Sequence, residues 1–192
     1  MMSDGKRRSR GAGWGAMTGA ILAAAQAGSP EAQAQIAAPA PTVAQAALAV
    51  TPENLVRFDA GQLEAIYRNA GPGRLPRGRV RGIPIVAPGR SFGPAASRAG
   101  RLVWQGKVFG DDGTSAVNRF FGVRAVRGRL YQGTSWLDGQ PSLVLDYQGT
   151  SLVYGRYRDE IREVAPGLYL GLMYTRSEPQ PTLTRYFAFR AD

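Results

Sequence analysis

The stretch PSLVLDYQGTSLVYGRYRDEIREVAPGLYLGLMY, residues 141–174, decides the fold. Two apolar runs, a charged run and a tight Pro166-Gly167 turn follow one another with few residues between them. Short runs separated by turn residues are typical of antiparallel strands joined by hairpins. We therefore expect the rest of the chain to add further strands around this segment.

Strand patterns continue on both sides of this stretch, and Asp138-Gly139 is a strong hairpin signal. Closing a sheet into a barrel removes the exposed edges that such short strands would otherwise leave. The chain therefore predicts a mainly β domain, a single up-and-down antiparallel β-barrel, with a β-sandwich as the alternative. We expect about eight or nine strands, near residues 79–86, 102–109, 118–126, 129–136, 142–147, 151–154, 157–164, 168–175 and 183–190.

A helix is expected before the first strand, over residues 51–70. Thr51-Pro52 is typical of a helix start, and Asp59 begins a second capping pattern. Gly71-Pro72 marks the end of the helix. A further short helix is expected within 91–100.

The N-terminus has the features of an export signal. A basic group, Lys6-Arg7-Arg8-Ser9-Arg10, precedes a small-residue apolar run. Cleavage is expected after Ala27 or Ala34, with residues 1–34 as the signal peptide. Residues 35–50 then form an Ala/Pro-rich linker, and residues 51–192 form the helix and the barrel. A periplasmic or secreted protein is the corresponding expectation.

Composition limits the chemistry, because the chain contains neither Cys nor His. Disulfides, thiol nucleophiles, imidazole catalysis and Cys or His zinc sites are excluded. No pattern indicates a metal or a cofactor, and we expect none. The formal charge is +10, and it falls to +8 without residues 1–34, which hold four basic and two acidic residues. A basic domain favours anionic partners such as an envelope surface, whereas the sparse aromatics in the Arg-rich segment 73–101 argue against specific nucleic-acid binding.

Residues 157–164 are the most charged strand. Tyr157, Asp159, Ile161 and Glu163 share one face, and residues 158, 160, 162 and 164 share the other. If one face looks into a barrel, its charges must be paired. The strand then belongs either to a structural ion-pair network or to a site for a polar head group.

Asp146 is the second charged position of interest, because it interrupts an apolar run. Arg158 or Arg162 is its expected partner, in an ion pair that fixes strand register. A dyad of Asp146 with Glu160 in acid–base chemistry is the alternative. Aromatic side chains on the strands either line a pocket or fill the core. Our candidates for ligand binding, with no catalytic residue and no metal ligand assigned, are Trp104, Lys107, Asp146, Tyr147, Arg158, Glu160, Arg162, Tyr169 and Tyr174.

Several motifs occur in a recognisable order: the run of residues 104–109 (WQGKVF), Asn118-Arg119, residues 138–141 (DGQP), residues 145–147 (LDY) and residues 186–189 (YFAF). In this order they resemble small bacterial lipocalin-like, calycin-type proteins of unknown function. The resemblance covers roughly residues 76–190 and implies a calycin-like barrel. No activity is implied by it.

Three functions remain open from the sequence. The first is an exported lipocalin-like protein that binds a small hydrophobic or amphipathic molecule, such as a lipid, in a barrel cavity. The second is a hydrolase or isomerase that uses carboxylates and tyrosines in that cavity. The third is a non-catalytic envelope protein that contacts anionic surfaces through residues 73–101.

Overall fold

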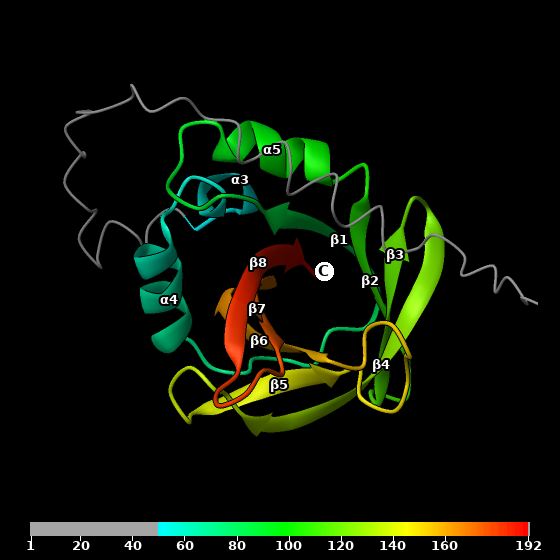
Figure 1. Ribbon diagram of the computed structural model, residues 1–192. Coiled ribbons are helices and arrows are strands. Elements are labelled where there is room, and N and C mark those ends of the chain that lie inside the picture. The colour runs from blue at the N-terminus through cyan, green and yellow to red at the C-terminus, as the bar shows by residue number, and fades with distance from the viewer. Residues whose placement is uncertain (1–49, 192) are drawn as a thin grey trace, which may run out of the picture. The chain divides into compact units, whose positions relative to one another are not determined.

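A computed structural model describes residues 50–191, and these form a closed antiparallel barrel with three short helices outside it (Figure 1). Each strand pairs with the next along the chain, and β8 closes the barrel against β1 over Arg81↔Arg190 to Ile85↔Tyr186. The predicted mainly β, up-and-down barrel is confirmed, with closure in place of a sandwich. The strands are β1 Gly78–Ile85, β2 Trp104–Phe109, β3 Ser115–Phe120, β4 Val123–Thr134, β5 Pro141–Asp146, β6 Tyr157–Ala165, β7 Leu168–Thr175 and β8 Thr182–Arg190.

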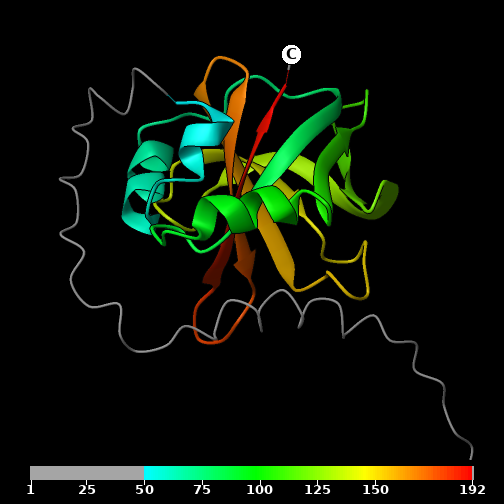
Figure 2. The same ribbon diagram turned by 90° about the horizontal axis from the view of Figure 1, so that it is seen from above.

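Glycines form the turns that the sequence indicated. Gly139 between β4 and β5 has φ +71°, and Gly167 between β6 and β7 has φ +69°. This left-handed backbone conformation costs glycine little and other residues more. The β4–β5 and β6–β7 hairpins therefore lie where Asp138-Gly139 and Pro166-Gly167 predicted them. Figure 2 shows the β6–β7 turn and the C-terminus at one end of the barrel, and the β5–β6 and β7–β8 connections at the other.

Two strand predictions were wrong. Residues 118–126 were expected to be one strand, but the chain turns at Phe121-Gly122, between β3 and β4. The apolar character of this run hid the turn, which needs positive φ at both residues and has 49° and 83°. Residues 151–154 were expected to be a strand, but they form a hydrogen-bonded turn in which the Tyr154 backbone N–H donates to Ser151 Oγ at 3.0 Å.

The predicted N-terminal helix is two helices, α3 (Pro52–Leu55) and α4 (Ala60–Arg68). The break falls at Asp59, which starts α4 with a capping box: the Gln62 N–H donates to Asp59 Oδ1 at 2.8 Å, and the Asp59 N–H donates to Gln62 Oε1 at 3.0 Å. The expected later helix is α5 (Gly93–Gly100). No helix within residues 50–191 is both long and apolar enough to cross a membrane.

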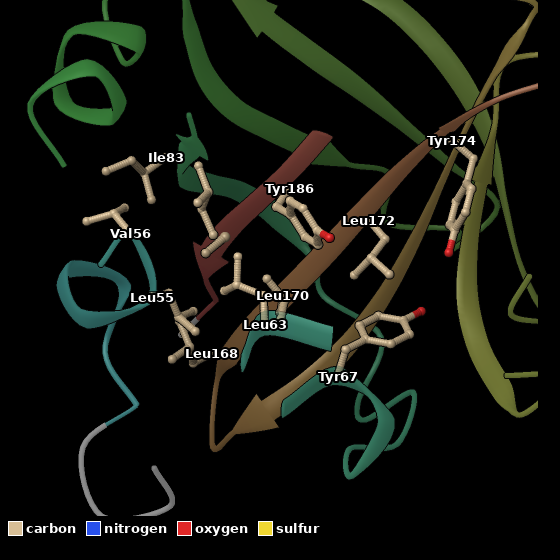
Figure 3. Close-up of a cluster of buried hydrophobic side chains, with 12 residues drawn as sticks. Leu55, Val56, Leu63, Tyr67, Ile83, Leu168, Leu170, Leu172, Tyr174 and Tyr186 are labelled. Carbon is tan, nitrogen blue, oxygen red and sulfur yellow. The ribbon is translucent and has the colours of Figure 1, made fainter. Parts of the chain in front are cut away.

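Helices α3 and α4 cover the outer face of the barrel at β1, β7 and β8 (Figure 3). Leu55, Leu63 and Tyr67 come from the helices, and they pack against outward-pointing side chains of β7 such as Leu168 and Leu170. Burial of such side chains stabilises the fold by about 1.5–3 kcal/mol each. The outer face of the barrel under α3 and α4 is therefore buried, as is most of the inner face.

The inner face is filled largely by aromatic rings. Tyr169 and Phe189 stack with their centroids 4.9 Å apart, and Phe109 lies 5.6 Å from Phe189. Gly171 has no side chain where the Phe187 ring lies, and an added Cβ there would collide with that ring. The end of the barrel near the C-terminus is thus a packed core, and only the other end leaves interior space.

Candidate functional site

Lys107 is the centre of the candidate site. The chain contains only two lysines, Lys6 and Lys107, among 24 basic residues. Lys107 is the only lysine within residues 50–191, and its side chain is 1% exposed inside the barrel. A lone lysine inside a barrel of an arginine-rich chain points to a compact ammonium as the group required there.

The ammonium of Lys107 donates to three oxygens. These are Asp159 Oδ2 at 2.7 Å, Asn118 Oδ1 at 2.8 Å and the Tyr147 hydroxyl at 3.1 Å. The Tyr147 hydroxyl in turn donates to Asp159 Oδ2 at 2.6 Å, and Trp104 Nε1 donates to Asn118 Oδ1 at 2.9 Å. We call these five residues the Lys107 network. All three protons of the ammonium have acceptors, so the charge is satisfied within the protein.

A β-bulge brings two members of the network to one face. Trp104 and Lys107 are three residues apart on β2, so a regular strand would point them to opposite faces. The register of β2 against β3 shifts between these two residues, and both side chains then point inward. Gly106, within the bulge, has φ +112°, and any Cβ there would clash with the carbonyl of Val80 on β1. Glycine is therefore required for this close approach of β1 and β2.

Burial sets the electrostatics of the network. Desolvation lowers the pKa of Lys107, while the neighbouring Asp159 carboxylate raises it again in part. Desolvation, and then the Asp159 charge, raise the pKa of Tyr147 well above its usual value. The Phe187 ring centroid lies 4.8 Å from the ammonium and adds a cation–π contact. Tyr147 is therefore neutral at physiological pH. Its hydroxyl donates to Asp159 and accepts from Lys107, the two members of the ion pair.

The network forms the floor of a pocket at the barrel end opposite the C-terminus, which we call the mouth pocket. Its volume is about 90 Å³, room for about three water molecules at roughly 30 Å³ each. Asp159, one of the lining residues, has an oxygen, Oδ1, that is buried without a hydrogen-bond partner in the protein. The pocket is therefore lined by aromatic rings and by a carboxylate with an unused acceptor. Besides Trp104, Lys107, Asn118, Tyr147 and Asp159, the lining residues are Pro84, Phe120, Tyr154, Met173, Arg185, Tyr186 and Phe187.

A larger cleft of about 700 Å³ lies at the opposite end, beside Arg74, Arg77 and the β6–β7 turn. Its carboxylate, Glu163, accepts from the backbone N–H groups of Gly167 at 2.7 Å and Arg74 at 3.0 Å, and these bonds lower its pKa. The Tyr169 hydroxyl donates to the Arg74 carbonyl at 2.8 Å. Because these groups already hold the chain together, the cleft is a weaker candidate than the mouth pocket.

The outer face of β6 carries a second buried network. Arg162 is fully buried and donates to both oxygens of Asp138, at 2.7 and 2.8 Å, and to the carbonyl of Tyr67 at 3.0 Å. Glu160 accepts from the Ser135 hydroxyl and from the Trp136 backbone N–H. Desolvation raises the pKa of Glu160. We call this set the outer network; it ties α4, β6 and the β4–β5 turn together.

The candidate residues from the sequence do not form one site: some lie inside the barrel, at one end or the other, and the rest lie on its outer face. Trp104, Lys107 and Tyr147 line the mouth pocket together. Tyr169 lies inside the barrel but at the filled end, stacked on Phe189. The remaining candidates lie on the outer face: Asp146, Arg158, Glu160, Arg162 and Tyr174.

The expected partner of Asp146 was wrong. Asp146 pairs with Arg176 of the segment after β7, at 2.8 Å, and not with Arg158 or Arg162. Arg158 instead stacks on Trp136, with 4.3 Å from guanidinium to ring centroid, and lies 3.3 Å from Glu160. Asp146 and Glu160 each have a local partner outside the barrel, so they do not form an acid–base dyad within the cavity.

Two members of the Lys107 network, Asn118 and Asp159, were missing from the sequence candidates. The strand period placed Asp159 on the face opposite Arg158, but nothing in the sequence said which face points inward. Asn118 could have been found from the sequence, because Lys107 and Asn118 flank one tight turn at a spacing that pairs them across the hairpin. In the structure they are cross-strand partners.

Comparison with known proteins adds little to this geometry. No family model matches the chain, and no curated protein matches it significantly. Among solved structures, a match is the crystal structure of a protein from Thermomonospora curvata, with 19% identity and a TM-score of 0.47. It covers 71% of this chain and 89% of that chain. Values this low support no inference about function, and the class of the molecule, an eight-stranded antiparallel barrel, follows from its own strands.

Proposed function

We propose that this barrel is a lipocalin-like binding protein that takes the polar end of a small amphipathic molecule into the mouth pocket. The observation that carries the proposal is the free Asp159 Oδ1 on the floor of an aromatic-lined pocket. A buried polar atom without a partner costs free energy, and a ligand that supplies the missing hydrogen bond recovers it. Binding pockets typically combine apolar walls with a few such polar groups.

The floor defines the chemistry of the bound group. The protons of Lys107 are already bound by acceptors, and the unused atom is a carboxylate oxygen. A carboxylate oxygen accepts, so the ligand must donate. An alcohol, a phenol or an amide N–H fits, and an anionic head group facing Asp159 does not.

The volume sets the size of the bound group. About 90 Å³ holds a few non-hydrogen atoms, well below the roughly 300–1,000 Å³ of pockets that enclose a whole drug-sized ligand. We therefore propose that the polar end enters and that an apolar remainder lies at the barrel mouth. Whole burial of a lipid chain is not part of the proposal.

Native mass spectrometry with 1-decanol and decanoic acid as probes tests the proposal. We expect the wild-type protein to retain decanol in preference to the acid. Asp159→Asn should weaken decanol binding about tenfold, the loss of roughly one good hydrogen bond to a charged acceptor. Met173→Trp should abolish it by filling the pocket.

Glu160→Gln provides the matched control, since it makes the same kind of change on the opposite face of the same strand. Its decanol binding should equal that of the wild type. Equal retention of alcohol and acid, or binding that is insensitive to both Asp159→Asn and Met173→Trp, would refute the mouth pocket as the site.

A catalytic role is the second candidate, and one observation favours it. Tyr147 and Asp159 form a 2.6 Å hydrogen bond next to the pocket space. A hydrolase or isomerase would use these two residues, with Tyr147 as the acid. Conversion of a bound carbonyl compound that is lost in Tyr147→Phe would support an enzyme, and binding without conversion supports the first proposal.

We also propose export to the periplasm or beyond. The signal peptide, its cleavage after Ala27 or Ala34 and the linker of residues 35–50 lie outside the described residues, apart from residue 50. The intact mass of the protein from its native host tests this proposal: a mature start at residue 28 or 35 is expected, and a chain that begins at Met1 refutes it.

A further inference from the structure

Five large apolar side chains stand exposed around the open end of the barrel. Each is more than half exposed, and Leu152 is completely exposed. They come from three of the segments at this end of the barrel: the segment before β2, the β3–β4 turn with the first residue of β4, and the β5–β6 loop. We call the set the mouth patch; it consists of Leu102, Phe121, Val123, Leu152 and Val153.

Hydrogen bonds and a ring contact bring these three segments together. The Phe121 N–H donates to the Val103 carbonyl at 3.0 Å, which places the β3–β4 turn beside Leu102. The ring of Tyr154 lies 6.0 Å from that of Phe120, so the β5–β6 loop reaches the end of β3. The Thr150 hydroxyl donates to the Arg127 carbonyl at 2.8 Å. These contacts place the three segments that carry the patch next to one another.

Phe121 shows that exposure here has a cost. It has φ +49° at the tip of its turn, where a bulky residue is strained, and it remains 59% exposed. Asn or Gly would adopt this conformation readily. Strain at an exposed aromatic residue is typical of a position retained for contact with a partner.

The segments that carry the patch contain arginines and no acidic residue, although Arg101 also lies 3.8 Å from Glu53 of α3. Residues 98–104, 119–127 and 147–157 contain no Asp or Glu. Arg119 lies close enough to Arg79 and Arg124 that desolvation and these two charges lower its pKa. Like charges held close together favour an anionic partner. The six arginines of these segments are Arg98, Arg101, Arg119, Arg124, Arg127 and Arg156.

We propose that the mouth patch docks on an anionic lipid bilayer, with its apolar side chains inserted between head groups and its arginines on the phosphates. Apolar side chains that protrude from separate loops, ringed by cations, are suited to a bilayer interface. A second copy of the chain would bring the same positive ring against itself, and the charge disfavours that pairing. This surface shares Arg98 and Arg101 with residues 73–101, but its apolar side chains lie outside that segment. It does not depend on whether the pocket binds a ligand.

Co-sedimentation with vesicles tests the proposal. The full chain should bind vesicles of equal parts phosphatidylcholine and phosphatidylglycerol, bind pure phosphatidylcholine weakly, and release as salt rises. The double variant Leu152→Glu with Val153→Glu should bind at least about tenfold more weakly. Leu75→Glu is the matched control: Leu75 is a partly exposed leucine that packs near Gly113 at the opposite end, and its variant should bind like the wild type.

A second readout does not depend on loss of binding. Val153→Trp should shift its emission to the blue on the mixed vesicles, and Leu75→Trp should not. No binding by the wild type, equal loss in Leu75→Glu, or an unshifted Val153→Trp would overturn the proposal. Self-association that is abolished by the double variant, without vesicle binding, would overturn it in favour of a second copy as the partner.

Discussion

Each face of β6 carries a buried carboxylate, Asp159 on the inner face and Glu160 on the outer face, but the two make different contacts. On the outer face, Arg162 and Glu160 bind backbone groups and loop side chains, and α4 with the β4–β5 turn covers them. On the inner face, Asp159 binds only side chains and keeps one oxygen free beside the mouth pocket. Two outer atoms, Arg158 Nε and Tyr174 Oη, also lack partners, but both side chains pack against Trp136. A buried polar atom without a partner therefore does not by itself indicate a binding site. Of these three residues, only Asp159 lines the mouth pocket.

The largest expected effect is on the outer face. Arg162→Ala should lower the free energy of unfolding by about 3–5 kcal/mol, because it leaves Asp138 and two or more buried carbonyls without their donor. Urea unfolding measures this. The matched control is Arg156→Ala, an exposed arginine just before β6, which should cost less than about 0.5 kcal/mol. A loss of that small size in Arg162→Ala would show that the outer network is not structural.

A smaller loss is expected on the inner face. Lys107→Met should cost about 2–3 kcal/mol, because Asp159 loses its cation but keeps the hydrogen bond from the Tyr147 hydroxyl. The double variant Lys107→Met with Asp159→Asn should recover about half of that loss. If the double variant is as unstable as the sum of its single variants, then Lys107 and Asp159 do not act as a pair.

The smallest effect is a pH dependence on the outer face. Burial raises the folded-state pKa of Glu160 above its ordinary value of 4.5, so the folded protein holds this proton more tightly than the unfolded chain. The stability contribution of this group is therefore greatest below pH 4.5 and is lost as the pH rises through the folded pKa. Unfolding of the wild type and Glu160→Gln from pH 4 upward should show the difference. A wild type that gains stability relative to Glu160→Gln with rising pH would reverse the assigned direction.

The sequence predicted much of the fold because local signals decide it. The caps at Thr51 and Asp59 and the turns at Asp138-Gly139 and Pro166-Gly167 depend only on neighbouring residues. The Phe121-Gly122 turn was missed because Phe rarely adopts positive φ.

The site was only partly predictable, for a physical reason. The alternation of side chains along a strand shows which residues share a face, but it does not show which face points into the barrel. Both faces of β6 are buried, the inner one by barrel closure and the outer one by α4 and the β4–β5 turn, so hydrophobicity could not tell Asp159 from Glu160. The bulge at Gly106, which brings Trp104 and Lys107 to the same face, likewise depends on contact between β1 and β2.

The two described tryptophans allow the most direct test of the central claim. Trp104 Nε1 donates to Asn118 in the pocket floor, whereas Trp136 covers the outer network. We predict that a titration with 1-decanol, followed by ¹H–¹⁵N NMR, shifts the Trp104 indole resonance and leaves that of Trp136 in place. In Asp159→Asn the same shift should require about tenfold more decanol. A shift of Trp136 alone, or no shift of Trp104 at saturating decanol, would contradict the assignment of the inner face as the binding site.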